Sequence, residues 1–383
     1  MSKNNMVPSI RFKEFTNAWE QERLGKISNF STGKGITISQ SLSKGFPIVS
    51  GGIDVMGYYS KYNRMENTIT IARAGKCGYV SFISEKFYLN DKCFSLDLKE
   101  NINSYFLFNL LKKNEKRIME LGSNSSIPTI TSTSLKAVDI FRTSYDEQKA
   151  IAILFVSINS LIALHQRKLN ALENLKKTLL EKMFPSENSV FPSIRFKEFT
   201  NAWEQERFNL LFRFVCKKGF KNLPILAATK ENGMQKRQDI NFNVQFNLDN
   251  IIKYKLVEPG QFVIHLSSYD SGLAHSTILG VTSPAYSVVD FINKENNDDK
   301  FWTFILKSKS FIDKLSSISY GLRVGKSINL NELNNIHLKS TNLIEQNKIS
   351  KLFSLLNSLI TLHQRKLNAL ENLKKTLLEK MFV

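Results

Sequence analysis

The residues that could carry catalytic chemistry in this sequence do not form a complete catalytic pattern. Gly325-Lys326-Ser327 has the ending of a phosphate-binding loop, but that motif requires glycine at position 320, where Tyr320 stands. His265 and His275 could share a metal ion, yet no cysteine or third histidine completes a ligand set. There is no Pro-Pro pair, which an amino-methyltransferase tetrad needs, and no nucleophile beside a base. These residues indicate a protein that binds rather than catalyses.

Basic, aromatic and small polar side chains mix in several loops, which favours contact with a polyanion. The 53 Lys and Arg exceed the 34 Asp and Glu, for a net charge of +19, so nucleic acid is the first partner to consider. Arg and Lys suit guanine edges and phosphates, and Asn suits adenine. The candidate DNA-contacting residues are Tyr59, Lys61, Arg64, Arg73, Lys76, Asn124, Ser125, Lys217, Lys218, Lys236, Arg237, His265, Ser268, Tyr269, Arg323 and Lys326. Taken alone, each could equally be a solvated surface group.

Length and composition are those of an ordinary globular protein. The 383 residues, 42% hydrophobic and 23% charged, are enough for two or three domains of roughly 100–200 residues. Cys77, Cys93 and Cys216 are too few and too scattered for a disulfide framework or a zinc finger. The longest continuous apolar run, residues 150–156, is far shorter than the ~20 residues that span a bilayer, and the first residues lack a secretory core. We therefore expect a cytoplasmic protein with no membrane partner.

Two blocks of sequence occur twice and divide the chain into a constant frame and two variable parts. The short repeat, PSIRFKEFTNAWEQER, fills residues 8–23 and 192–207 without change. The long repeat, SLIALHQRKLNALENLKKTLLEKMF, fills residues 160–184 and 358–382 with one change, Ala163 against Thr361. A recent duplication without functional meaning would blur frame and middle alike, whereas near-identity stops at the block edges. The pattern predicts one frame that carries two divergent recognition domains.

Residues 145–184 carry the clearest helical periodicity, with apolar residues three and four apart and no Gly or Pro. A capping box fits the start of this helix, Ser144 with Glu147, and the start of its repeat, Asn342 with Glu345. At 1.5 Å per residue each helix is about 55–60 Å long. The apolar stripe predicts that the two helices pair antiparallel as a coiled coil, and two separate three-helix cores are the alternative.

Between the repeats, both variable parts alternate strands and helices in the same order. The expected strands are residues 68–72, 79–83, 93–98 and 137–141, then 261–266, 286–291 and one ending near Leu338, with helices over 104–121 and 300–316. The fold class is α+β: two mixed α/β domains joined by two long antiparallel helices, with pseudo-two-fold symmetry. The expected bounds are 1–143 and 187–341 for the domains, each opening with a short repeat, and 144–186 and 342–383 for the helices.

Identical frame surfaces on both halves should bind two copies of one partner. The candidate partner-docking residues are Trp19, Trp203, Leu169, Leu172, Leu367 and Leu370. The competing interpretation is that the aromatic residues of the short repeat pack that segment onto its own domain. The helix stripe is also imperfect, since His165 and its repeat His363 fall near the seam.

With two divergent recognition domains, two spacer helices and a duplicated frame, the chain resembles the specificity subunit of type I restriction–modification systems. The resemblance covers nearly the whole sequence and rests on both repeats, on Gly122 and Gly321 near the block endings, and on two motifs of the second variable part. These motifs are Val257-Glu-Pro-Gly-Gln-Phe-Val-Ile264 and Ser283-Pro-Ala-Tyr286. Each signal is weak alone, and together they are specific.

The resemblance implies that this chain supplies an address and no chemistry of its own. In that family each recognition domain reads one half of a bipartite, asymmetric site on double-stranded DNA, and the helices set the gap. Two methyltransferase subunits dock on the helices and use S-adenosylmethionine, and restriction subunits join to cleave with ATP and Mg²⁺. No cofactor or metal is expected in this chain. The alternatives are the recognition portion of another restriction or methylation system and a two-headed nucleic-acid-binding scaffold.

Overall fold

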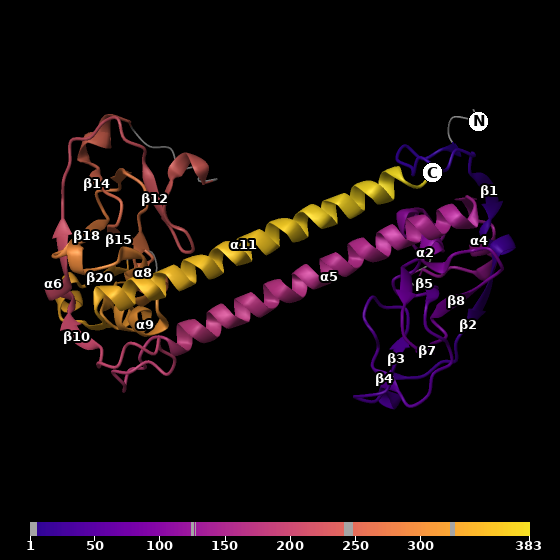
Figure 1. The fold of residues 1–383 in the computed structure, drawn as a ribbon, viewed down its shortest axis with the longest axis horizontal. Helices are drawn as coiled ribbons and strands as arrows, with labels where there is room; N and C mark the ends of the chain where they lie inside the picture. The colour runs from indigo at the N-terminus through magenta and orange to yellow at the C-terminus, as the bar shows by residue number, and fades with distance from the viewer. Residues whose placement is uncertain (1–5, 124–125, 127, 241–247, 322–325) are drawn as a thin grey trace. The chain divides into compact units, whose positions relative to one another are not determined.

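The computed structural model describes residues 6–123, 126, 128–240, 248–321 and 326–383 (Figure 1). The chain forms two compact units. Unit 1 comprises Met1–Lys168 with His363–Val383, and unit 2 comprises Leu169–Leu362. Each unit therefore contains one α/β domain, the start of one long helix and the end of the other.

The two long helices are α5 (Tyr145–Lys182) and α11 (Leu343–Lys380), with 38 residues each. In unit 1 the start of α5 packs on the end of α11, since the ring centroids of Phe155 and Phe382 are 5.7 Å apart. Unit 2 repeats the relation: Phe184, just after α5, lies 6.3 Å from Phe353 of α11 between ring centroids. Within each unit the two helices run antiparallel, as the sequence predicts.

The start of each long helix departs from the predicted capping box in one respect. Ser144 Oγ accepts the amide N–H of Glu147 at 3.4 Å, which is the first half of the box. The carboxylate of Glu147 turns elsewhere: it is fully buried and accepts bonds from Arg11 of the short repeat and from the Thr143 hydroxyl. The second copy repeats this arrangement with Asn342, Glu345, Arg195 and Thr341. The prediction is corrected accordingly: these glutamates hold the short repeat against the helix start.

The domain of unit 1 contains nine strands and several short helices among its described residues. The strands are β1 (Glu20–Arg23), β2 (Ser28–Thr32), β3 (Phe46–Val49), β4 (Tyr58–Tyr59), β5 (Thr68–Ala72), β6 (Val80–Ile83), β7 (Tyr88–Leu89), β8 (Cys93–Leu98) and β9 (Asp139–Arg142). The helices are α1 (Leu24–Ile27), the 3-10 helix η2 (Ile38–Gln40), α2 (Ser104–Lys113), α3 (Glu115–Met119) and α4 (Ser132–Lys136). The main sheet is antiparallel in the order β2-β8-β5-β6, a smaller sheet has the order β4-β3-β7, and β1 pairs with β9.

The domain of unit 2 is built in the same way. Its strands are β10 (Glu204–Arg207), β11 (Phe212–Val215), β12 (Leu226–Thr229), β13 (Gly233–Lys236), β14 (Lys255–Val257), β15 (Phe262–Ile264), β16 (Ala274–His275), β17 (Gly280–Thr282), β18 (Ser287–Phe291), β19 (Ser319–Tyr320), β20 (Ser327–Ile328) and β21 (His337–Ser340). Its helices are α6 (Phe208–Leu211), η3 (Arg237–Asp239), η4 (Leu248–Lys253), α7 (Ser268–Ser271), η5 (Lys294–Asn296), α8 (Asp299–Leu306), α9 (Lys309–Ser317) and α10 (Leu330–Asn334). The main sheet has the order β11-β18-β15-β16, and β10 pairs with β21.

The two main sheets have the same connectivity, which confirms the predicted common architecture. In chain order, the first strand pairs with the fourth, the fourth with the second and the second with the third, in both units. The frame strands also match in register, with Glu20 opposite Arg142 and Glu204 opposite Ser340. Each of the two helices expected in the domains is instead a pair of helices. In unit 1 the helix breaks at Asn114, between α2 and α3. In unit 2 a second helix starts after Ser308, whose Oγ accepts the Phe311 amide at 3.2 Å.

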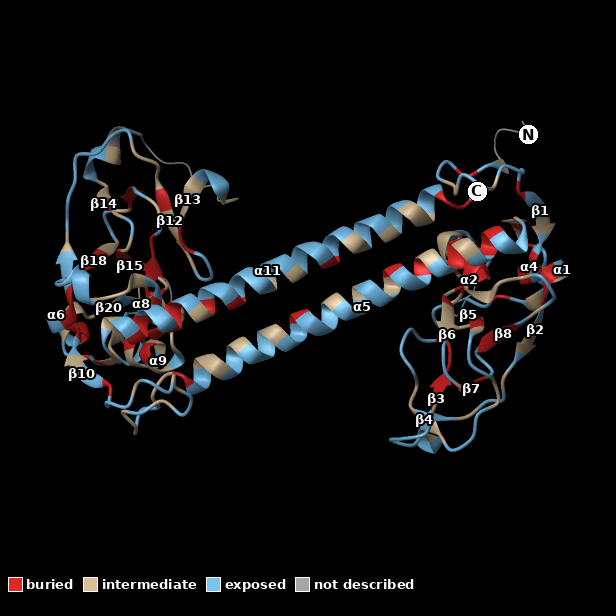
Figure 2. Ribbon diagram, in the orientation of Figure 1, coloured by how far each residue is buried: buried red, intermediate tan, exposed pale blue. Residues whose placement is uncertain are grey.

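Aromatic side chains fill the region where the short repeat, the domain and the helix ends meet. In unit 1 the ring of Trp19 is 1% exposed and lies 6.1 Å from that of Phe382. In unit 2 Trp203 is 3% exposed and lies 5.8 Å from Phe184 and 5.6 Å from Phe301. Figure 2 shows the buried positions of α5 and α11 gathered mainly where each helix meets a domain. The cores therefore attach each helix end to its domain.

By length and composition, α5 could cross a membrane, and it is the one helix within the described ranges that could. The sequence prediction considered only the short continuous apolar run, whereas helical periodicity spreads apolar residues over a longer stretch. Ile151 and Phe155 of this stretch are buried in the core of unit 1. One such helix is weak evidence for a membrane, because helices of protein cores can have the same length and composition.

Candidate nucleic-acid interface

In each main sheet, the loop after the strand that comes second in chain order contains many of the candidate contact residues. In unit 1 the loop follows β5 and contains Arg73 and Lys76. In unit 2 it follows β15 and contains His265 and the short helix α7, with Ser268 and Tyr269. Because β5 and β15 have the same place in their sheets, these loops are structurally equivalent. The structure thus places two unrelated stretches of sequence at one position of a shared scaffold.

Backbone hydrogen bonds hold the loop of unit 1 firmly. The Arg73 amide donates to the Lys92 carbonyl at 2.9 Å, and the Lys76 amide donates to the Gly51 carbonyl at 2.7 Å. The guanidinium of Arg73 lies 5.5 Å from the centre of the Phe94 ring, which restricts its direction. The Lys76 side chain is exposed and can approach a phosphate.

The candidates between residues 58 and 64 have different surroundings. The Tyr59 ring meets Tyr88 at 4.7 Å between centroids, and Lys61 is exposed. Arg64 donates to the Ser95 hydroxyl at 2.7 Å and to the Thr32 carbonyl at 3.0 Å, with further bonds to neighbouring oxygens. Its guanidinium bridges β2 and β8, which gives Arg64 a structural role, and its contact with DNA stays a prediction.

Three candidates, Asn124, Ser125 and Arg323, lie outside the described residues. Their described neighbour Ser123 donates its amide to the Thr129 carbonyl at 3.0 Å, and its hydroxyl accepts the Thr129 amide at 3.1 Å. The next residue, Ile130, donates its amide to the Arg73 carbonyl at 2.9 Å. Ser123 and Thr129 are therefore attached to the loop that contains Arg73.

In unit 2 the loop after β15 combines a neutral histidine with an aromatic ring. Burial lowers the pKa of His265 to about 4, against the opposing effect of Asp270, so the imidazole is neutral near pH 7. Ser268 is fully buried and its hydroxyl accepts the His265 amide at 2.9 Å, so it shapes this segment, which disfavours the predicted direct contact with DNA. Tyr269 is half-buried, and the ammonium of Lys326 lies 4.7 Å from the centre of its ring. The structure brings Lys326 to this loop although it is distant in sequence.

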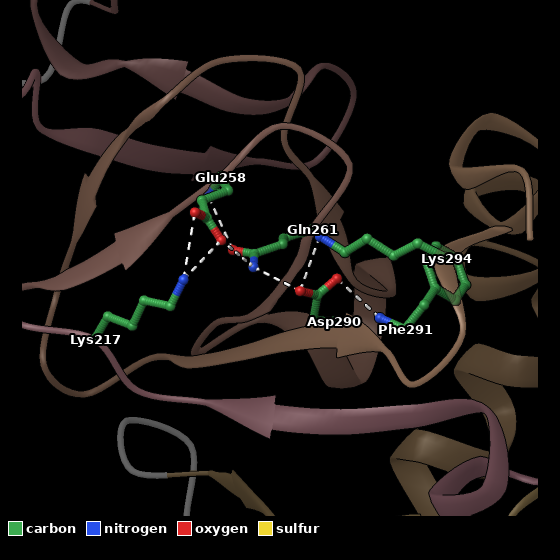
Figure 3. Close-up of polar contacts among 6 residues, drawn as sticks. All are labelled: Lys217, Glu258, Gln261, Asp290, Phe291 and Lys294. Atoms are coloured by element: carbon green, nitrogen blue, oxygen red, sulfur yellow. Dashed lines mark hydrogen bonds and ion pairs between the residues drawn. The ribbon is translucent and has the colours of Figure 1, made fainter.

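Lys217 belongs to a polar network that joins three segments of unit 2 (Figure 3). Its ammonium lies 3.4 Å from both carboxylate oxygens of Glu258. The side-chain nitrogen of Gln261, Nε2, donates to the Glu258 carboxylate at 3.1 Å and to the Asp290 carboxylate at 3.0 Å. Lys294 forms an ion pair with Asp290 at 3.0 Å. Gln261 and Asp290 are buried. Glu258 therefore partly neutralises Lys217, which weakens it as a phosphate contact.

The remaining basic candidates of unit 2 are near the same loop or exposed. Lys218 is exposed, and Lys236 and Arg237 are half-buried where β13 meets η3. Burial raises the pKa of the Tyr286 phenol, and the positive charge of nearby Arg237 opposes this rise. The Tyr286 ring in turn lies 6.2 Å from that of His265. Arg237 is thus brought toward the loop after β15.

The candidate docking residues are mostly buried. The rings of Trp19 and Trp203 pack inside the two cores, which favours the packing interpretation over partner docking for these two residues. Leu169 and Leu367 are each 4% exposed, and two more leucines are half-buried: Leu172 and Leu370. Partner contact by the rest of the repeated surface stays a prediction.

Sequence reasoning missed Arg11, Arg195 and the part played by their glutamates. Arg11 is 10% exposed, and its Nε and Nη2 atoms each lie 2.7 Å from a carboxylate oxygen of Glu147. The hydrogen bond to Glu147 raises the pKa of Arg11 above its ordinary value, although burial acts to lower it. Arg195 and Glu345 form the same pair in unit 2. The signal that could have found them is that both partners recur at equivalent positions of the duplicated frame.

No group of three or more His, Cys, Asp or Glu side chains within the described ranges is arranged to hold a metal ion. His275 Nε2 lies 2.5 Å from Asp299 Oδ2, whereas His265 Nδ1 accepts the Ser267 amide within its own loop. The two histidines therefore have different partners. What the two equivalent loops offer is charge, aromatic rings and hydrogen-bonding groups for binding.

Known proteins share this architecture. Residues 16–174 match the family model of the type I restriction modification DNA specificity domain. The chain is 26% identical over 151 residues to a putative type I specificity subunit of Mycoplasma genitalium. This alignment covers 38% of this chain and 39% of that protein. It is 23% identical over 391 residues to the specificity subunit of the type I restriction enzyme MjaVIII of Methanocaldococcus jannaschii, covering 94% of this chain and 91% of that protein. The match to the Mycoplasma protein thus spans about two fifths of its length, 39%.

A solved structure shows the same fold over the full length. The crystal structure of the S subunit of a type I restriction-modification system from M. genitalium superimposes with a TM-score of 0.68. The alignment covers 99% of each chain at 18% sequence identity.

Proposed function

We propose that this chain, a member of the type I specificity-subunit family by its residues 16–174 and by its fold, is the DNA-recognition subunit of a type I restriction–modification complex. Each α/β domain reads one half of a bipartite, asymmetric site on double-stranded DNA. The long helices set the gap between the halves. The chain has no catalytic role of its own.

The observation that carries this proposal is that equivalent loops of the two domains present different residues. The loop after β5 offers Arg73 and Lys76, whereas the loop after β15 offers His265 and Tyr269, with Lys326 over the tyrosine ring. A scaffold that keeps its sheet and frame while changing these loops suits the reading of two different base sequences. The net charge of +19 supports contact with the DNA backbone.

The length of the helices fits a role in spacing. A helix of 38 residues extends about 57 Å at 1.5 Å per residue. DNA rises 3.4 Å per base pair, so one helix corresponds to about 17 base pairs. This length supports two readers on successive major grooves.

The first experiment is a map of modified adenines in DNA from cells that carry this chain with its partner methyltransferase, compared with cells that lack only this chain. A bipartite motif that disappears without the chain supports the recognition role. An unchanged pattern of methylation in active cells would contradict it and would favour a two-headed scaffold for another nucleic-acid system.

Domain exchange tests the assignment of one half-site to each domain. Replacing residues 208–340 with the corresponding block of another specificity subunit should change one half-site and leave the other intact. A change in both half-sites would contradict the modular arrangement. An insertion of one heptad in each long helix should widen the gap while both half-sites stay the same, and this variant also controls for general damage.

The same proposal includes the partners. Two methyltransferase subunits with S-adenosylmethionine dock on the repeated frame, and restriction subunits with ATP and Mg²⁺ join them in the cytoplasm. The functional divisions of the chain are residues 1–143, 144–186, 187–341 and 342–383. Support comes from the identical short repeats, each held to a long helix by the same buried ion pair, Arg11 with Glu147 and Arg195 with Glu345. Native mass spectrometry should give two methyltransferase chains per copy, and a one-to-one complex would contradict this part.

A further inference from the structure

The turn between β3 and β4 in unit 1 exposes two large aliphatic side chains. Ile53 is 56% exposed and Val55 is 48% exposed. We call residues 50–57 the apolar tip. Apolar side chains on a loop gain nothing from water, and burying each would be favourable by about 25 cal/mol per Å² of apolar surface. They are not part of the buried core of the unit, so they are available for contact with a ligand.

The apolar tip is held in place by the neighbouring chain. At its base, the Ile48 amide donates to the Gly57 carbonyl and the Met56 amide donates to the Ile48 carbonyl, both at 2.9 Å. At its start, the Gly51 carbonyl accepts the Lys76 amide at 2.7 Å. A Cβ on Gly51 would collide with the Ala74 carbonyl, so the two loops are in close backbone contact. A side chain on such a fixed loop binds without a large cost of ordering the backbone.

A small hollow lies between the apolar tip and the outer side of β5 and β6. Its volume is about 40 Å³, and its lining combines apolar side chains such as Ile53, Val55 and Ala72 with the polar groups of Ser50, Asp54, Thr70, Tyr79 and Ser81. Roughly 10–15 Å³ is enough to hold one water, so this hollow has room for a methyl group and little more. Within this mixed lining, Ile53 and Val55 supply the apolar contact that a methyl group favours.

The charges around the apolar tip indicate DNA as the ligand. Lys76, bonded through its backbone to the tip, is exposed. Lys92, whose carbonyl accepts the Arg73 amide, is exposed as well. Asp54 is the one acid among residues 50–57 and can accept a hydrogen bond from a base amino group. An aliphatic pair beside two cations suits a base edge flanked by phosphates better than it suits an apolar groove of a protein.

We propose that Ile53 and Val55 recognise the 5-methyl group of a thymine in the half-site read by the first domain. Thymine is the one base of ordinary DNA that presents a methyl group in the major groove, and apolar side chains read it by contact. The inference rests on the proposed function and adds to it one base type and two specificity-determining residues.

The test replaces each thymine of the first half-site by deoxyuridine, which lacks only the methyl group. Once the methylation map has given the motif, binding of the complex of this chain with its methyltransferase is measured on duplexes of that sequence. Loss of one buried methyl group should weaken binding about three- to fivefold at one thymine. In the double variant Ile53→Ala/Val55→Ala the same replacement should have no further effect.

A matched control distinguishes the apolar tip from exposed aliphatic residues in general. Ile38 is 72% exposed in the same domain and lies outside the tip, so Ile38→Ala should keep full sensitivity to deoxyuridine. An unchanged second half-site in the methylation map of the double variant shows that it folds. A first half-site without thymine, or equal binding of thymine and deoxyuridine duplexes, overturns the inference and leaves the proposed function standing. A motif that does not depend on the chain at all overturns the proposed function itself.

Discussion

Arg11 and Glu147 join the short repeat to the first long helix, with Nε–Oε1 and Nη2–Oε2 distances of 2.7 Å each. Arg195 and Glu345 reproduce the pair in unit 2 with the same two distances. Both glutamate side chains are 0% exposed, and the arginines are 10% and 12% exposed. In each unit the pair therefore connects the segment that opens a domain to the helix that follows it.

Replacing Arg11 with Met should strongly destabilise unit 1, because Glu147 would stay buried without its counter-charge. Loss of one member of a buried pair costs about 3–5 kcal/mol. Urea unfolding followed by circular dichroism should show a lower midpoint for the transition of unit 1. The control Lys13→Met changes an exposed residue of the same repeat and should stay within about 0.5 kcal/mol of the parent. Equal midpoints for the two variants would contradict the role of the pair.

His165 and His363 come from the two copies of the long repeat and lie Nδ1 to Nδ1 at 2.9 Å in unit 1. A bond between two imidazole nitrogens needs at least one neutral ring, since a protonated histidine only donates. The pKa of His165 is lowered, first by desolvation and then by the charges of His363, Lys366 and Lys168. The folded-state pKa thus lies below the unfolded value of about 6.5. The stabilising contribution is fully present above the unfolded value and is lost as pH falls below it and through the lower folded-state pKa.

Thermal unfolding of the parent and of His165→Gln checks this dependence. The parent should be the more stable of the two at about pH 7.5, and the difference should shrink at about pH 5.5 as the unfolded histidine becomes protonated. His337→Gln changes an exposed histidine and should give no such pH-dependent difference. A difference for His165→Gln that is independent of pH would show that the contact, and not its protonation, matters.

The long helices and the main strands could be predicted because their signals are local and repeated. The helix of 38 residues that begins at Tyr145 keeps its apolar stripe over many turns, and its second copy doubles the signal. Strand β5, Thr68–Ala72, has four β-branched residues in a row and matches the predicted range. Near-identical frames on both sides of unlike middles also predicted two domains of one architecture.

The direction of individual loop side chains could not be predicted, because it depends on contacts between distant segments. Arg64 reads as a surface cation in sequence, yet Ser95 and Thr32 bind its guanidinium. Ser268 lies in a polar stretch, and only the fold shows that its hydroxyl is turned into the loop toward the His265 amide. The apolar tip was missed because isolated Ile and Val residues give no signal until their exposure is known.

Replacing Gln261 with Glu should destabilise unit 2 in a pH-dependent way. The side-chain nitrogen of Gln261 donates to Glu258 and to the buried Asp290, so a carboxylate there would face two others (Figure 3). Repulsion and burial would raise the folded-state pKa of the new group above its unfolded value of about 4.3. The destabilisation, about 1–3 kcal/mol, should be full at neutral pH and relieved as pH falls through the raised pKa.

Thermal unfolding at about pH 7.5 and about pH 5 measures the effect of Gln261→Glu. Gln235→Glu serves as the matched control, because Gln235 is half-buried on β13 of the same domain and its side chain donates to backbone carbonyls. It should give a smaller change that varies little with pH. Similar losses for both variants would mean that the network around Asp290 has no special weight.

Lys218 and Lys217 are adjacent but should differ in their contribution to DNA binding. Lys218 is exposed, whereas the ammonium of Lys217 lies 3.4 Å from Glu258. A lysine that neutralises one phosphate contributes about 0.9 to the slope of log affinity against log salt concentration, so Lys218→Ala should reduce the slope by that amount and weaken binding on all sequences alike. Lys217→Ala should reduce the slope less, and His265→Gln should leave the slope unchanged, because the pKa of His265, about 4, keeps its ring uncharged.

These slopes are measured with the assembled methyltransferase complex on specific and unrelated duplexes. If Lys217→Ala lowered the slope as much as Lys218→Ala, DNA would displace Glu258 from Lys217, and the network in Figure 3 would open on binding.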